Sequence, residues 1–100
     1  MSSVRLEVMP WLSRYFGAER SGQVVLEREV SDGATVRDLL EEIASQNQEF
    51  NEVLFDAKTG SLAGHISVIL NGRFLELAGG LEAKLRPGDT IRLMPAFSGG

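Results

Sequence analysis

The group in this sequence that is most readily assigned a reaction is its terminal carboxylate, which Gly100 carries after Ser98 and Gly99. Glycine has no Cβ, so a Gly-Gly end is thin and flexible enough to thread a narrow channel into another protein's active site. The carboxylate of Gly100 is ionised at neutral pH. It resists nucleophiles in that state, so it must first be activated, for instance by adenylation. The alternative is simple fraying, because chain ends are commonly disordered and tolerant of change.

The other reactive side chains form no recognisable catalytic or metal site. His65 has no cysteine and no second histidine to complete a metal site, so no bound metal is expected. Ser98 has no histidine base close in sequence, and Glu41, Glu42 and Glu52 fit a solvated face. The sequence contains neither a phosphate loop nor a GxGxxG motif, so any ATP would be used by a separate enzyme and no cofactor is expected to bind stably. Since the chain has no cysteine, any sulfur that it carried would have to sit on the terminus itself, as a thiocarboxylate.

The composition indicates one globular domain of 100 residues with an ordinary apolar fraction of 43% and a charged fraction of 24%. A formal net charge of −4 argues against nucleic-acid binding, which needs a basic face. No apolar run is long enough to span a membrane, and Arg5 and Glu7 interrupt the first apolar stretch, unlike a signal peptide. The absence of cysteine fits a reducing compartment, and we expect the protein to be cytoplasmic.

Hydrophobic periodicity predicts the elements that would position the tail. Strands are expected at residues 4–8, 23–30 and 90–94 from alternation, and at residues 66–70 from a nearly continuous apolar run. Asn71 and Gly72 are typical of a two-residue hairpin turn, which predicts a returning strand at residues 73–77. Residues 11–16 suit one or two helical turns, residues 56–64 an exposed loop, and residues 86–89 a tight turn.

One main helix is predicted at about residues 35–46. Thr35 is its expected N-cap and Asp38 the partner in a capping box. The helix carries an apolar stripe, which is expected to pack on the sheet. That stripe consists of Val36, Leu39, Leu40 and Ile43.

At this point four motifs in order resemble the small ubiquitin-like sulfur carriers of the MoaD/ThiS family. They are Gly33-Ala34-Thr35-Val36-Arg37-Asp38-Leu39-Leu40, Ile69-Leu70-Asn71-Gly72, Leu85-Arg86-Pro87-Gly88-Asp89 and Met94-Pro95-Ala96-Phe97-Ser98-Gly99-Gly100. The resemblance implies an α+β fold of the β-grasp type, a mixed sheet of four to five strands with one main helix on one face. Its first and last strands would lie parallel in the centre. A domain of residues 1–94 would then present a tail of residues 95–100.

The resemblance also implies a function. An E1-like adenylating enzyme of the MoeB/ThiF type would activate Gly100, a sulfur donor would give the thiocarboxylate, and a second enzyme would consume the sulfur. The chain would thus be a carrier and not an enzyme. The consuming partner is expected to be the large subunit of a molybdopterin synthase, with the chain as small subunit. The expanded segment of residues 47–64 and the Pro-Ala-Phe tail also resemble sulfur carriers for cysteine biosynthesis. A protein modifier that forms isopeptide bonds through Gly100, and a structural module with an idle tail, stay open.

A shared binding surface is predicted from strand alternation. If Ile91 and Leu93 face the helix, the side chains of Met9 and Met94 lie on the open side of the sheet. Methionine adapts to more than one partner, and grouped exposed apolar side chains commonly mark a binding surface. Met9, Met94 and Phe97, together with Ile69, are therefore the expected partner-binding residues. Gly99 and Ser98 are expected to thread the channel.

Overall fold

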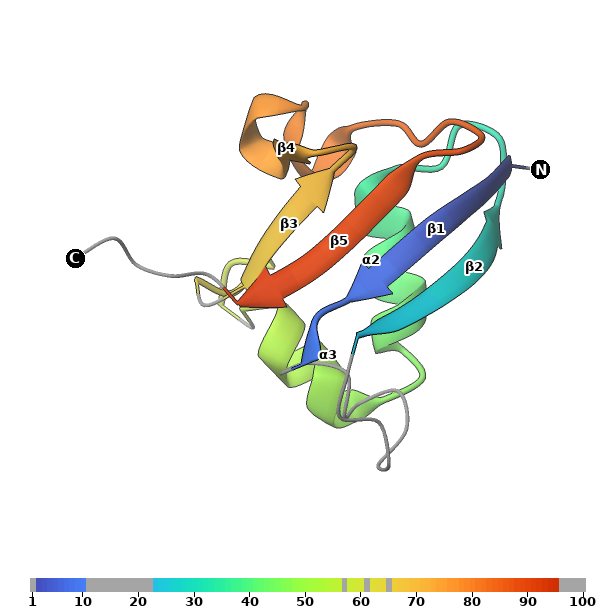
Figure 1. The fold of residues 1–100 in the computed structure, drawn as a ribbon. Helices are drawn as coiled ribbons and strands as arrows, with labels where there is room; N and C mark the ends of the chain where they lie inside the picture. Colours follow the sequence, from blue (N-terminus) through green and yellow to red (C-terminus); the bar gives the residue numbers. More distant parts are fainter. Residues whose placement is uncertain (1, 11–22, 57, 61, 65, 96–100) are drawn as a thin grey trace.

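A five-stranded mixed sheet lies on one side of the molecule and two helices cover one of its faces (Figure 1). The computed structural model describes residues 2–10, 23–56, 58–60, 62–64 and 66–95. The strands are β1 (Ser2–Val8), β2 (Val24–Val30), β3 (Ile66–Leu70), β4 (Arg73–Phe74) and β5 (Thr90–Pro95). The helices are α2 (Val36–Ala44) and α3 (Gln48–Leu54), with 3₁₀ turns η2 (Leu75–Leu77) and η3 (Gly80–Glu82). The expected α+β fold with a mixed sheet is confirmed.

The centre of the sheet is formed by β1 and β5, which run parallel. The strand order is β2-β1-β5-β3-β4, and the parallel pairing runs from Arg5 opposite Thr90 to Val8 opposite Leu93. Strands β2 and β3 pair antiparallel on either side. The predicted central parallel pair is therefore confirmed, and the strand that leads to the C-terminal tail is held on both edges.

Helix α2 begins where the sequence indicates, at a capping box. The Thr35 side chain accepts a hydrogen bond from the Asp38 backbone N–H at 3.2 Å, and the Asp38 carboxylate accepts one from the Thr35 N–H at 3.0 Å. Two N–H groups that lack intrahelical partners are thereby satisfied. The predicted stripe, Val36, Leu39, Leu40 and Ile43, is buried.

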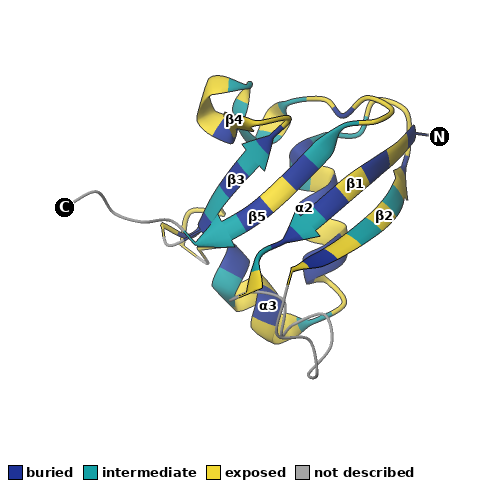
Figure 2. Ribbon diagram, in the orientation of Figure 1, coloured by how far each residue is buried: buried dark blue, intermediate teal, exposed yellow. Residues whose placement is uncertain are grey.

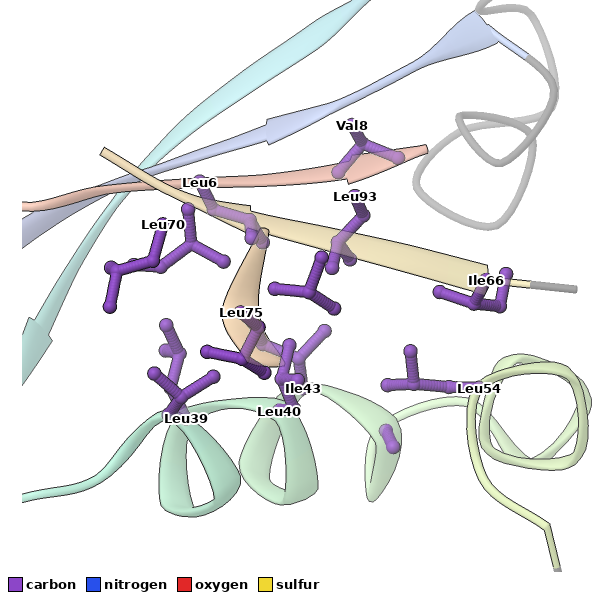
Figure 3. Packing of buried hydrophobic residues seen from close by; sticks show 14 of the residues in the cluster. Leu6, Val8, Leu39, Leu40, Ile43, Leu54, Ile66, Leu70, Leu75 and Leu93 are labelled. Atoms are coloured by element: carbon purple, nitrogen blue, oxygen red, sulfur yellow. The ribbon is translucent and has the colours of Figure 1, made fainter. Parts of the chain in front are cut away.

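The core lies between this stripe and the inward side chains of the sheet (Figure 3). Leu6 and Leu93 point from the central strands toward Leu39, Leu40 and Ile43, as Figure 3 shows. Leu6, Leu40 and Leu93 have no exposed side-chain surface. Alternation along β1 and β5 therefore places one side of each strand in the core and leaves the other on the open face (Figure 2).

Helix α3 was not predicted. Its segment carries a short apolar set at helical spacing, Phe50, Val53 and Leu54, of which Phe50 and Leu54 are buried and Val53 is half-buried against the core. The Asn47 side chain caps it by accepting a hydrogen bond from the Phe50 N–H at 3.1 Å. Part of the expanded segment between α2 and β3 thus forms a second helix, which packs its buried side chains into the same core. No helix in the described ranges is long and apolar enough to cross a membrane.

The hairpin after β3 is confirmed, but its second strand is shorter than predicted. Asn71 and Gly72 have φ of 52° and 84°, as a two-residue turn of this type requires. Strand β4 ends at Phe74 instead of residue 77, because the buried Leu75 turns the chain into the 3₁₀ turn η2. The predicted helical turns at residues 11–16 and the side chain of His65 lie outside the described residues.

Candidate functional site

The predicted reactive end, Ser98, Gly99 and Gly100, lies outside the described residues, as does Phe97. The structure describes the point from which these residues continue, the end of β5 at Pro95. What positions the site is therefore the anchoring of that strand.

Strand β5 is paired with β3 up to its last residue and with β1 up to Leu93. Pro95 is paired with Ile66 at the start of β3. On the other side, the Met9 N–H donates a hydrogen bond to the Leu93 carbonyl oxygen at 3.0 Å. The chain after Pro95 accordingly starts from a defined place between the beginning of β3 and the end of β1.

Met9, Ile69 and Met94 lie together on the open face of the sheet, where alternation placed them. All three are half-buried, and their neighbours in the strands, Val8 and Leu93 among them, are buried in the core. Met9 follows Val8, which pairs with Leu93, so Met9 and Met94 are adjacent beside the exit of the tail. Their role in binding partners stays a prediction.

Phe74 extends this apolar group and was missed in the sequence. It pairs with Ile69 across β3 and β4, which places it on the same open face, and it is 53% exposed. The two-residue turn at Asn71 and Gly72 implies that register, so the signal was present in the sequence. We call Met9, Ile69, Phe74 and Met94 the apolar patch.

A charged pair lies beside the apolar patch. The Glu7 Oε1 atom accepts from both Arg92 Nε, at 3.0 Å, and Arg92 Nη2, at 2.9 Å. Gln23 Nε2 donates to the same oxygen at 3.4 Å. Glu7 is opposite Arg92 across β1 and β5, and Arg92 is opposite Ile69 across β5 and β3. The sequence predicts Glu7 on the outer side of β1, but it does not reveal its partner.

Three grooves of the described surface have no residue of the apolar patch in their lining. A groove of about 460 Å³ between the end of β2 and α2 is lined by the carboxylates of Glu29, Asp32, Asp38 and Glu42. Among the described residues that line it there is no lysine or arginine. Such a groove repels the phosphates of a nucleotide. Within the described ranges, no group of three or more histidine, cysteine or carboxylate side chains is arranged to hold a metal ion.

Comparison with solved structures supports the architecture. The small archaeal modifier protein 1 of Methanosarcina acetivorans is 27% identical, covers 100% of this chain and 98% of its own, and superposes with a TM-score of 0.71. A chain of the BexX/CysO complex of Amycolatopsis orientalis is 28% identical, with 97% of this chain and 99% of that chain covered and a TM-score of 0.70. Urm1 of Trypanosoma brucei, 21% identical with 99% and 96% covered and a TM-score of 0.74, shares the fold.

Comparison of sequences identifies the family. A candidate sulfur carrier protein of Archaeoglobus fulgidus is 40% identical over 43 residues, which are 43% of this chain. That match spans about half (49%) of the relative's length. The sequence profile of the ThiS family matches residues 14–100, which are most of the chain and include β2 to β5 and the Gly-Gly end, but not β1. The chain therefore belongs to the ThiS family of ubiquitin-like sulfur carriers.

Proposed function

We propose that Gly100 is the reactive residue of a carrier that transports sulfur as a C-terminal thiocarboxylate. The observation that carries this proposal is the ThiS family match, which continues through Gly100 itself. The anchoring of β5 supports it, because a rigidly held last strand lets a partner bind the domain and receive the tail at a fixed place. The chain would act as a co-substrate and not as a catalyst, in the cytoplasm.

The chemistry would take place on a separate E1-like adenylating enzyme. The Gly100 carboxylate attacks the α-phosphorus of ATP, and pyrophosphate leaves. Hydrosulfide supplied by a sulfur donor then attacks the acyl carbon of the adenylate, the bond to the phosphate breaks and AMP leaves, and loss of the sulfur-bound proton gives the thiocarboxylate. This chain would supply the carboxylate and the surface that the enzyme recognises.

For the sulfur acceptor we propose the pyranopterin precursor of molybdopterin, held by the large subunit of a molybdopterin synthase. This part rests on the sequence motifs quoted above. The 28% identity to a chain of the BexX/CysO complex, over nearly the whole of this chain, supports the alternative, a carrier for cysteine biosynthesis. Thiocarboxylated protein offered separately to the two acceptor enzymes distinguishes them, because only the cognate enzyme should restore the terminal carboxylate.

A second candidate function is protein modification, which the 27% identity to a small archaeal modifier protein favours. In that case an amine attacks the adenylate and an isopeptide bond forms through Gly100. Intact mass measurement of protein from its own host separates the two functions. Replacement of one terminal oxygen by sulfur supports the carrier, and high-mass conjugates support the modifier.

The test of both functions is a variant extended by one alanine after Gly100. Its former carboxylate is an amide, and the new carboxylate lies about 3.5 Å farther along the channel. With the adenylating enzyme of the same organism and ATP, the native chain should release pyrophosphate and the extended chain should not. Equal release from both, with the extension shown intact by mass, would contradict the proposal.

A further inference from the structure

The Glu7–Arg92 pair lies in a cross-strand row on the open face. The row runs from Val25 on β2 through Glu7, Arg92 and Ile69 to Phe74 on β4, each residue opposite the next. Its ends are apolar, and the charged pair occupies the two central strands. Met94 and Met9 form the adjoining position beside the tail exit. A protein that receives the residues after Pro95 must approach the end of β5, which lies beside Met9 and Met94.

The two members of the pair are not equally exposed. The Glu7 side chain is 12% exposed, whereas that of Arg92 is 47% exposed. The guanidinium therefore covers the carboxylate, and the surface presents a cation next to the apolar patch. This local charge is opposite to the formal net charge of the chain, −4.

The hydrogen bonds of Arg92 orient it for a second acceptor. Nε and Nη2 both donate to Glu7, which occupies one side of the planar guanidinium. Arginine has N–H groups on a second side, formed by Nη1 and Nη2, which matches a carboxylate bidentately. Within the described ranges, that second side has no hydrogen-bond or ion-pair partner. Glu7 thus holds the fork in place before a partner arrives, which reduces the ordering cost of binding.

We infer that the open face binds an apolar surface of the adenylating enzyme that carries one aspartate or glutamate, and that Arg92 receives this carboxylate. Glu7 is a positioning residue, because it acts through Arg92. The apolar patch excludes water around the new ion pair, which strengthens it. This inference rests on the proposed function and adds the chemistry of the partner surface.

The inference is tested with two double variants that are designed to fold like the native protein, so that a change in binding is not caused by unfolding. Glu7→Met/Arg92→Met removes both charges and leaves unbranched apolar side chains, a replacement that is often neutral or stabilising for an ion pair. Glu7→Arg/Arg92→Glu exchanges the partners, so the internal ion pair persists while the exposed charge is reversed. Thermal melting establishes that each variant is folded.

The measurement is pyrophosphate release by the adenylating enzyme of the same organism, at varied concentrations of carrier and salt. We expect KM for the carrier to rise about tenfold in the methionine variant and further in the exchanged variant, with kcat little changed. The salt dependence of KM should flatten in the methionine variant. Arg5→Met is the matched control, since Arg5 is 54% exposed on the same face of β1 and its contact with Glu27 is 3.9 Å long. Its KM should stay at the native value.

Three outcomes would overturn the inference in distinguishable ways. Native turnover with an unchanged or lower KM in the folded methionine variant shows that the partner needs only an apolar face. No pyrophosphate release from the native chain itself overturns the proposed function and the inference together. An unchanged KM in the exchanged variant would show that the pair serves only the stability of the sheet.

Discussion

Gly79 has a backbone conformation that a side chain would disturb. Its φ is +112°, and an added Cβ would lie 3.2 Å from the Ala83 Cβ. Gly79→Ala should lower the free energy of unfolding by about 1–2 kcal/mol, measured by urea denaturation, and leave pyrophosphate release per folded molecule unchanged. Gly64→Ala is the control, because Gly64 has no atom within 4 Å of the added Cβ and no φ in the left-handed range. A loss of activity in folded Gly79→Ala would mean that this internal glycine has a function.

Leu40 tests the buried face of α2. The side chain is fully buried among Leu39, Ile43 and the inward residues of the sheet. Leu40→Ala should therefore cost about 2–5 kcal/mol of unfolding free energy, from lost burial and the remaining cavity. Glu41→Ala, one position along on the exposed face, should change stability by less than about 0.5 kcal/mol. If Leu40→Ala melted with the native protein, the assignment of the core would be wrong.

At the scale of the element, the capping box of α2 is expected to contribute measurably to stability. Thr35→Ala removes the oxygen that accepts from the Asp38 N–H and should cost about 1 kcal/mol. Thr35→Ser retains that oxygen and should restore most of the loss. Chemical denaturation of both variants gives the comparison. Equal stability of all three proteins would show that the cap bond contributes nothing in solution.

The elements differ in how far their sequence alone determined them. Helix α2 and the turn at Asn71 and Gly72 were predicted correctly, because a cap, an apolar stripe and a positive-φ pair are local signals. Helix α3 was missed because it is short and because it is stabilised by the packing of its two buried side chains into a core formed by residues distant in the sequence. Strand β4 was predicted too long because burial of Leu75, a tertiary effect, ends it.

The candidate site shows the same distinction. The open-face positions of Met9 and Met94 followed from alternation within single strands, whereas Ile69 belongs to a strand that was predicted from a nearly continuous apolar run. The partnership of Glu7 with Arg92 depends on the register between β1 and β5, which are far apart in the sequence and joined by no turn. Nothing local specifies that register, since it is selected by the packing of the whole core.

At the scale of the whole molecule, the two halves of the open face should differ in function. Met94→Lys, beside the tail exit, should raise KM for the adenylating enzyme about tenfold and impair sulfur delivery, because a charge would be buried in the contact. Val25→Lys is the control, since Val25 is 50% exposed on the same face but at the opposite edge, on β2. Both variants should melt close to the native protein. Equal kinetics for Met94→Lys and the native chain would remove the apolar patch from the interface.

The parallel pairing of β1 with β5 also governs when the protein can fold during synthesis. A ribosome makes β1 first, but the partner that completes the centre of the sheet is separated from it by most of the chain, from Arg5 to Thr90. Closing so long a loop makes the central pairing a late event in folding. A nascent chain that stops before Thr90 leaves one edge of β1 unpaired and the core open. Prematurely terminated chains, which lack the Gly-Gly end, should therefore stay unfolded and be degraded. They would then not bind the proposed adenylating enzyme as unreactive competitors of the complete chain.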